Sequence, residues 1–373
     1  MRPSYGPGVK PALSIYFDFA RAFAALAVVL THLSELFFPN YSTVIPGHDA
    51  VMLFFVLSGY VIAYVSDRPS LTLRRYLFDR LSRLWSVQVP AALLAGVAMV
   101  LVGAVQLPGG TAWAPTWSSF LLDTIANLTF LGQGWSSPIL SPYNTPVWSL
   151  NYEAWYYAIF AAWIFLPGRT RIFVGAALCV LAGPKVMALM PCWLAGVVLY
   201  RYRDRIVMGE RAAAALFIGA LALYAVCYAL DTRVLAVHFV QRISHGQSYH
   251  LGWSTPFLSD YFVALLVSAQ FAAVMSMPRL GQALERWKAP IVWAASYTLS
   301  LYLFHMPLAI MLFAGAGLDA YGTAGALITL SAILLSVVLL GTITEHRRSD
   351  WRRWMAWIFS IRSFRRATAP ANQ

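Results

Sequence analysis

The ionisable residues that interrupt long apolar segments are the first candidates for chemistry in this sequence. Arg21 and His32 bound the stretch RAFAALAVVLTH, whose ten intervening residues are almost all apolar. A charged group in a segment that crosses a bilayer is costly, so each one is a candidate functional residue, with a paired structural charge as the alternative. The other members of this set are Asp18, Glu35, Glu153 and His305, with Asp260 and Glu345 near segment ends.

The composition places these residues in a membrane protein. Hydrophobic residues make up 60% of the 373 residues and charged residues only 11%, and the mean hydropathy is +0.64. Apolar runs of about 20 residues recur, which is the length a helix needs to cross a bilayer. The first run has no small-residue cleavage site after it, so we expect a retained helix and not a signal peptide. The three cysteines lie within apolar stretches and indicate packing, not a disulfide or metal framework.

The apolar runs predict an all-α, polytopic protein with ten transmembrane helices. The predicted spans are residues 15–38, 50–66, 85–106, 147–167, 171–184, 186–200, 212–230, 257–277, 291–313 and 323–345. If the N-terminus is cytoplasmic, 23 of the 27 Lys and Arg residues fall in cytoplasmic segments. This bias predicts that both termini are cytoplasmic. The net charge of +12 is thereby a signal of topology, and no nucleic-acid partner is expected.

One membrane domain is expected over residues 1–373, with its helices within about residues 12–345. Residues 346–373 read as a basic amphipathic tail on the cytoplasmic membrane surface. The stretches 107–146 and 231–256 are predicted to be outer loops, because the first has no Lys or Arg and both separate apolar runs.

Counting residues along the predicted spans gives the depth of each candidate. Arg21 lies about 9 Å from the inner surface and His32 about 25 Å. On the same count His305 lies about 21 Å from the inner surface, while Glu153 and Ser58 lie about 9 Å and about 12 Å below the outer surface. Four of these residues therefore share a level in the outer half of the membrane, which predicts a reaction centre there.

Each candidate also has a structural interpretation. An intramembrane His can simply bond a carbonyl of a neighbouring helix, with Glu153 as its partner. Ser58, beside Gly59 in FFVLSGY, can be a small residue that allows close helix packing. The arginines of the segment after the second span, Arg74, Arg75, Arg80 and Arg83, either set the topology or bind a phosphorylated molecule at the inner surface.

Five separated stretches resemble the family-3 integral membrane acyltransferases. They are Arg21 with ten residues before His32, FFVLSGYVI at 54–62, RRYLFDRLSRLW at 74–85, PVWSLNYEAWYY at 146–157 and SYTLSLYLFHMPL at 296–308. They span nearly the whole chain in the family's order. The resemblance implies a ten-helix enzyme of a bacterial inner membrane that transfers an acyl group, usually acetyl, from cytoplasmic acetyl-CoA to a hydroxyl of an extracytoplasmic glycan, such as an exopolysaccharide or O-antigen.

Carried over by position, Arg21 and His32 match the essential Arg and His of this family. Glu153 matches its Glu after Trp-Ser-Leu, and His305 matches its ninth-helix His. Met52 departs from the pattern, because many members have Asp there, and it leaves open any role for an acid at that point. Some members carry an appended outer domain for the final transfer; here the membrane domain is expected to complete the transfer itself.

The predicted mechanism places the phosphates of CoA against the four arginines and threads its pantetheine arm past Arg21 toward His32. Neutral His32 acts as general base on the acceptor hydroxyl, or carries the acyl group itself. Glu35 or Glu153 orients the imidazole, and His305 or Ser58 donates to the developing oxyanion.

Two other classes of protein fit parts of the pattern. A secondary transporter would use Arg21, His32 and Glu153 as a relay near the midplane, but the sequence lacks internal repeats. A non-catalytic subunit of a polysaccharide export complex would tolerate loss of His32. No metal is expected, because the spacing of His238, His245 and His250 is irregular. The sequence defines no oligomeric state.

Overall fold

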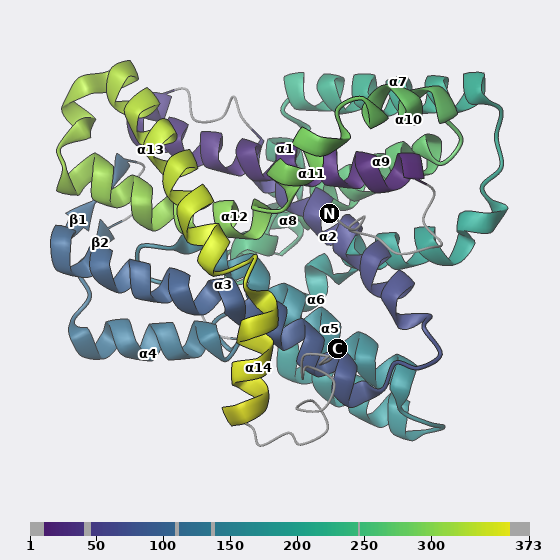
Figure 1. The fold of residues 1–373 in the computed structure, drawn as a ribbon, viewed down its shortest axis with the longest axis horizontal. Helices are drawn as coiled ribbons and strands as arrows, with labels where there is room; N and C mark the ends of the chain where they lie inside the picture. The colour runs from purple at the N-terminus through teal and green to yellow at the C-terminus, as the bar shows by residue number, and fades with distance from the viewer. Residues whose placement is uncertain (1–10, 41–45, 109–111, 136–138, 245–246, 359–373) are drawn as a thin grey trace, which may run out of the picture.

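The computed structural model describes residues 11–40, 46–108, 112–135, 139–244 and 247–358, and in them the chain is a bundle of helices (Figure 1). The α-helices are α1 (Pro11–Phe37), α2 (Gly47–Ser66), α3 (Leu73–Val102), α4 (Trp117–Leu128), α5 (Trp148–Phe165), α6 (Thr170–Tyr202), α7 (Glu210–Ala229), α8 (Thr232–Ile243), α9 (Phe257–Val274), α10 (Pro278–Glu285), α11 (Lys288–Ala295), α12 (Thr298–Ile310), α13 (Gly322–Ile343) and α14 (Arg348–Ile358). Short 3-10 turns are η3 (Thr145–Val147), η4 (Arg203–Arg205), η5 (Gln247–Ser254) and η7 (Leu318–Tyr321), and η6 (Met311–Gly315) is a π-helical turn. The all-α class is confirmed.

The multi-pass architecture is also confirmed, with eight helical segments in the described chain that are long and apolar enough to cross a membrane. They are Ala12–Phe37, Gly47–Ser66, Leu73–Val102, Thr170–Arg205, Glu210–Ala229, Phe257–Val274, Thr298–Gly315 and Leu318–Ile343. The most apolar window of α7 is only 11% buried within the protein and that of the Leu318–Ile343 segment 22%, against 61% for the segment that contains α12. The first two therefore present most of their surface to lipid, whereas α12 lies in the interior.

The prediction of ten spans differs from these eight at two places. Residues 171–184 and 186–200 were expected as separate spans, but they belong to α6, which bends where Gly183 adopts a φ of 81°. Helix α5 is 18 residues long, yet its Tyr and Trp residues, with Asn151 and Glu153, make it less apolar than the eight. Helix α5 can carry these polar side chains within the bundle because neighbouring helices bury most of its residues.

The predicted outer loop at 107–146 contains structure of its own. Strands β1 (Val105–Gln106) and β2 (Ala112–Trp113) pair antiparallel, with Val105 opposite Trp113, at the end of α3 (Figure 1). Helix α4 follows, and its N-cap Thr116 accepts a hydrogen bond from the backbone N–H of Ser119. The second predicted loop, 231–256, likewise forms α8 and η5. Both segments still lie between membrane-spanning helices, because their own helices are too short to cross a bilayer.

Helices α2 and α6 pack closely through two glycines. A Cβ placed on Gly196 would lie 1.8 Å from the carbonyl oxygen of Val56, and one on Gly59 would lie 1.9 Å from that of Trp193. Such contacts between backbones are the usual means by which membrane helices approach each other. The expectation of close packing beside Ser58 therefore agrees with the structure, and this contact fixes the face of α2 that carries Ser58.

We expect Gly196→Ala to destabilise the protein by about 1–3 kcal/mol, because the new methyl group must push α2 and α6 apart. The measurement is the midpoint of thermal unfolding of the purified protein in detergent. Gly175→Ala is the matched control on the same helix, since a Cβ there meets no atom within 4 Å. Equal midpoints for the two variants would contradict the close contact.

Helix α14 lies against α3 beyond the last span (Figure 1). Met355 and Ala356 are buried against Phe78 of α3. Arg352 forms an ion pair with Asp79, with 2.7 Å between Nη2 and Oδ1. The described part of the tail is therefore anchored on the protein, and the rest of the predicted tail, residues 359–373, lies outside the described residues.

Candidate active site

Two histidines from helices far apart in sequence stack on each other. The rings of His32 on α1 and His305 on α12 have centroids 5.3 Å apart and planes 23° apart. His305 is fully buried, whereas 19% of the His32 side chain is exposed. The pair therefore combines a buried ring with one that a substrate can reach.

Hydrogen bonds define the tautomers of the neutral rings. Nδ1 of His32 lies 2.9 Å from Oε2 of Glu35, and Nδ1 of His305 lies 3.0 Å from the carbonyl oxygen of Leu301. Ionised carboxylates and carbonyls only accept hydrogen bonds, so Nδ1 carries the proton in each ring and Nε2 keeps its lone pair. Nε2 of His305 is buried and has no hydrogen-bond partner among the described residues. Each ring thus offers an unprotonated nitrogen.

A second polar group lies around Glu153 on α5. Ser58 Oγ donates a hydrogen bond of 2.5 Å to Oε1 of Glu153, and the hydroxyl of Tyr157 donates to the same oxygen. Trp193 Nε1 donates to Ser58 Oγ at 3.2 Å. The carboxylate and the serine hydroxyl are thereby held in fixed positions by α5, α2 and α6.

A pocket of about 360 Å³ runs inside the bundle beside this group. Its residues on α2 extend from Val51 to Val65, which is about 21 Å along a helix. Four arginines and two carboxylates face it, together with Ser58 and apolar side chains. These charged residues are Arg21, Arg80, Arg83, Arg348, Glu153 and Glu345. The pocket is thus long, narrow and more positive than negative.

The candidate residues divide between the pocket and the histidine pair. Within the described chain, His32, Glu35 and His305 do not line the pocket. Tyr302 belongs to both places, because it lines the pocket and its ring centroid lies 6.3 Å from that of His305. Its hydroxyl is held by the carbonyl of Pro146 at 3.0 Å. The shared depth predicted for four residues therefore corresponds to two adjacent groups, with Tyr302 between them.

The arginines after α2 also divide. Arg80 and Arg83 line the pocket, but Arg74 and Arg75, in the first turn of α3, are exposed and outside its lining as described. Arg21 lines it too and forms an ion pair with the buried Asp18, with 3.1 Å between Nη2 and Oδ1. Only part of the predicted arginine cluster can therefore contact a molecule inside the pocket.

Several residues in the pocket or next to it escaped the sequence analysis. Tyr157 lies one helical turn after Glu153, and Tyr302 lies three residues before His305, so helical spacing around the candidates was a usable signal. Trp193 lies on α6, across the close α2–α6 contact from Ser58, and Arg348 follows the last apolar run. No sequence pattern indicated that Trp193 lies beside Ser58, or that Arg348 lies beside the other arginines.

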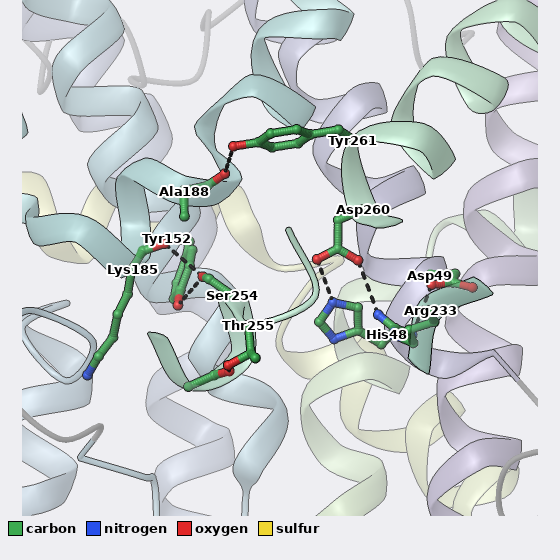
Figure 2. A network of polar contacts seen from close by, with 11 residues as sticks. His48, Asp49, Tyr152, Lys185, Ala188, Arg233, Ser254, Thr255, Asp260 and Tyr261 are labelled. Atoms are coloured by element: carbon green, nitrogen blue, oxygen red, sulfur yellow. Dashed lines mark hydrogen bonds and ion pairs between the residues drawn. The ribbon is translucent and has the colours of Figure 1, made fainter. Parts of the chain in front are cut away.

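A separate network joins α2, α8 and α9 (Figure 2). Arg233 bridges two carboxylates, with 3.1 Å to Asp49 Oδ1 and 3.1 Å to Asp260 Oδ1. Asp260 also lies 3.2 Å from Nε2 of His48, and Tyr224 donates to Asp49 at 2.9 Å. Asp49, the acid upstream of Met52, is therefore taken up by an ion pair, and Met52 itself is fully buried.

A buried histidine stacked on a half-buried one, with carboxylates beside a pocket within apolar helices, defines an integral membrane protein equipped for proton or group transfer. Residues 14–345 match the family model of acyltransferase family 3, described as an acyltransferase domain. The chain belongs to this family of acyltransferases. The family membership favours the enzyme over the transporter and the non-catalytic subunit.

Two curated proteins are similar to parts of the chain. Acyltransferase MdmB of Streptomyces mycarofaciens is 29% identical over 188 residues, 46% of each chain. Exopolysaccharide production protein ExoZ of Rhizobium meliloti (strain 1021) is 32% identical over 145 residues, which are 38% of this chain and 43% of ExoZ. The chain therefore aligns with less than half the length of these relatives. No solved structure matches it.

Proposed function

We propose that this acyltransferase moves an acetyl group from acetyl-CoA to a hydroxyl of an extracytoplasmic glycan. The observation that carries the proposal is the long pocket, which has arginines along it and ends beside a histidine pair. Arginines suit the phosphates of CoA, and unprotonated imidazoles suit the removal of a proton from a hydroxyl. The name of ExoZ supports a polysaccharide as the acceptor.

The proposed orientation follows from the loops. Lys and Arg are concentrated in segments that share one side, so both termini are cytoplasmic in this proposal and the enzyme lies in a bacterial inner membrane. If α5 and the two arms of α6 each count as a crossing, the helices supply the ten segments of the family topology. Acetyl-CoA then enters beside Arg80 and Arg83, and the glycan reaches His32 from the outer side.

In the proposed reaction, Nε2 of His32 removes the proton from the acceptor hydroxyl while the oxygen of that hydroxyl attacks the thioester carbonyl carbon. A C–O bond forms, the C–S bond breaks, and the proton passes from His32 to the departing thiolate of CoA. Glu35 orients His32 through Nδ1. A transfer through acyl-His32 balances in the same way, with the imidazole as the first nucleophile.

The oxyanion needs a hydrogen-bond donor near the thioester. Neutral His305 presents Nε2 as an acceptor in the tautomer set by Leu301, so it is a poor donor in this state. Ser58 carries a hydroxyl hydrogen in the pocket, and rotation away from Glu153 would turn it to the carbonyl oxygen. We assign the donor role to Ser58 and a positioning role beside His32 to His305.

The test is transfer of radiolabelled acetyl groups from acetyl-CoA in membrane vesicles that contain the wild-type protein. We expect label in the glycan fraction when acetyl-CoA is added to inverted vesicles, and none when it is added outside right-side-out vesicles. Vesicles without the protein are the control. Equal labelling in the control would overturn the activity, and labelling of right-side-out vesicles would overturn the orientation.

A further inference from the structure

The C-terminal helix α14 brings an arginine into the pocket from outside the apolar spans. Arg348, in its first turn, lines the pocket together with Arg80 and Arg83 of α3. Its Nη2 donates to the carbonyl oxygen of Asp79 at 2.9 Å. This bond and the contact of Met355 with Phe78 hold the guanidinium against α3.

Arginines outnumber carboxylates around Arg348 at this end of the pocket. Burial, followed by the positive charges of Arg83 and Arg80, lowers the pKa of Arg348 to about 9, while Asp79 opposes this shift. Glu345 faces the same pocket, but its Oε2 accepts hydrogen bonds from the backbone N–H and hydroxyl of Ser300, at 3.0 and 2.9 Å.

Unused hydrogen-bonding capacity points the same way. Nε of Arg80 is buried and has no hydrogen-bond partner among the described residues. A bound anion would supply that partner and would also relieve the repulsion between the three guanidinium groups. This end of the pocket is therefore built to receive negative charge.

We propose that Arg348 binds a phosphate of the acyl donor together with Arg80 and Arg83, so that the tail helix α14 completes the donor site. The inference rests on the proposed use of acetyl-CoA. Guanidinium groups bind phosphate through paired N–H donors, which a lysine cannot reproduce. Arg347 and Arg353 of the same segment pair with Asp350 instead and are exposed, so they have no such role.

The experiment measures equilibrium binding of CoA to the purified full-length protein in phosphatidylcholine nanodiscs. We expect Arg348→Ala to weaken CoA binding by about tenfold to a hundredfold, as for loss of a hydrogen bond to a charged group. Arg348→Lys should bind with intermediate affinity. Arg353→Ala is the matched control on α14 and should bind like the wild type. S-acetylpantetheine, which has no phosphate, should bind equally to the wild type and to Arg348→Ala.

The outcomes separate this inference from the proposed function. If the wild type does not bind CoA, the proposed donor falls and the role of Arg348 falls with it. If the wild type binds CoA and Arg348→Ala binds it equally, only the role of Arg348 is overturned. Equal weakening of CoA and S-acetylpantetheine would assign Arg348 a structural role and overturn the inference too.

An anionic lipid headgroup has the same phosphate chemistry, so the measurement is repeated in nanodiscs that contain phosphatidylglycerol. If Arg348 belongs to the donor site, the affinity for CoA should be lower for Arg348→Ala than for the wild type in both kinds of nanodisc. A difference confined to nanodiscs with phosphatidylglycerol would mean that Arg348 binds lipid and would overturn the inference. Thermal unfolding of each variant checks that α14 remains folded.

Discussion

His32→Ala should lower the rate of acetyl transfer by about 10²–10⁴-fold, the usual contribution of a general base. The variant removes the Nε2 lone pair that Glu35 orients and that stacking on His305 positions. CoA binding should stay within about twofold of the wild type, because His32 lies outside the described lining of the pocket. The effect therefore appears in the turnover number and not in donor affinity.

The measurement is the initial rate of transfer at saturating acetyl-CoA, at matched amounts of folded protein. His238→Ala is the control of the same type, since His238 lies on α8 and outside the described pocket lining. Glu35→Gln should show a smaller loss, about tenfold, because the amide keeps a contact with the ring but no longer favours the tautomer or the charge that develops on it. Transfer by His32→Ala at the wild-type rate would remove this histidine from the chemistry.

Helical spacing alone predicted that Arg21 and His32 serve different parts of the site. They are eleven positions apart on one face of a helix and so lie at different depths, and the structure places Arg21 in the pocket and His32 against His305. Depth along a span could be counted in the same way for Glu153. The direction in which Glu153 points could not be predicted, because it depends on how α5 is rotated against α2. In the structure its carboxylate accepts hydrogen bonds from Ser58 and Tyr157.

Contacts between helices that the pattern of apolar residues does not reveal could not be predicted from the sequence either. The tail could be recognised as basic and amphipathic, but its position on α3 depends on Met355, Ala356 and Phe78 meeting in space. The sequence predicted an interruption near Pro184, where two apolar runs meet. It did not show that both runs belong to one bent helix, α6. Residues that act together through separate helices are thus the part of the site that one sequence cannot locate.

The network in Figure 2 is the strongest example of such a contact. Arg233 is separated by 184 residues from Asp49 and by 27 from Asp260, yet it bridges them. Asp260 is fully buried, and only 11% of the Asp49 side chain is exposed. Two carboxylates in such positions require a cation, and the position of α8 depends on supplying it.

We expect Arg233→Gln to reduce the free energy of unfolding by about 3–5 kcal/mol, nearer the lower value because 31% of the arginine side chain is exposed. The loss has two physical causes, which are the missing ion pairs and the two carboxylates left without their shared cation. Its measurement is the amount of monodisperse protein after extraction in detergent, followed by its unfolding midpoint. Arg242→Gln is the matched control, because Arg242 is exposed on the same helix.

A compensating variant tests the cause. If uncompensated negative charge is responsible, adding Asp49→Asn and Asp260→Asn to Arg233→Gln should recover much of the lost stability, since neutral amides can still hydrogen-bond to Tyr224 and His48. If the triple variant is no more stable than Arg233→Gln, the loss comes from packing of the arginine and not from its charge. Recovery of stability together with wild-type transfer activity per folded protein would further show that this network holds α2, α8 and α9 in place and takes no part in the chemistry at His32.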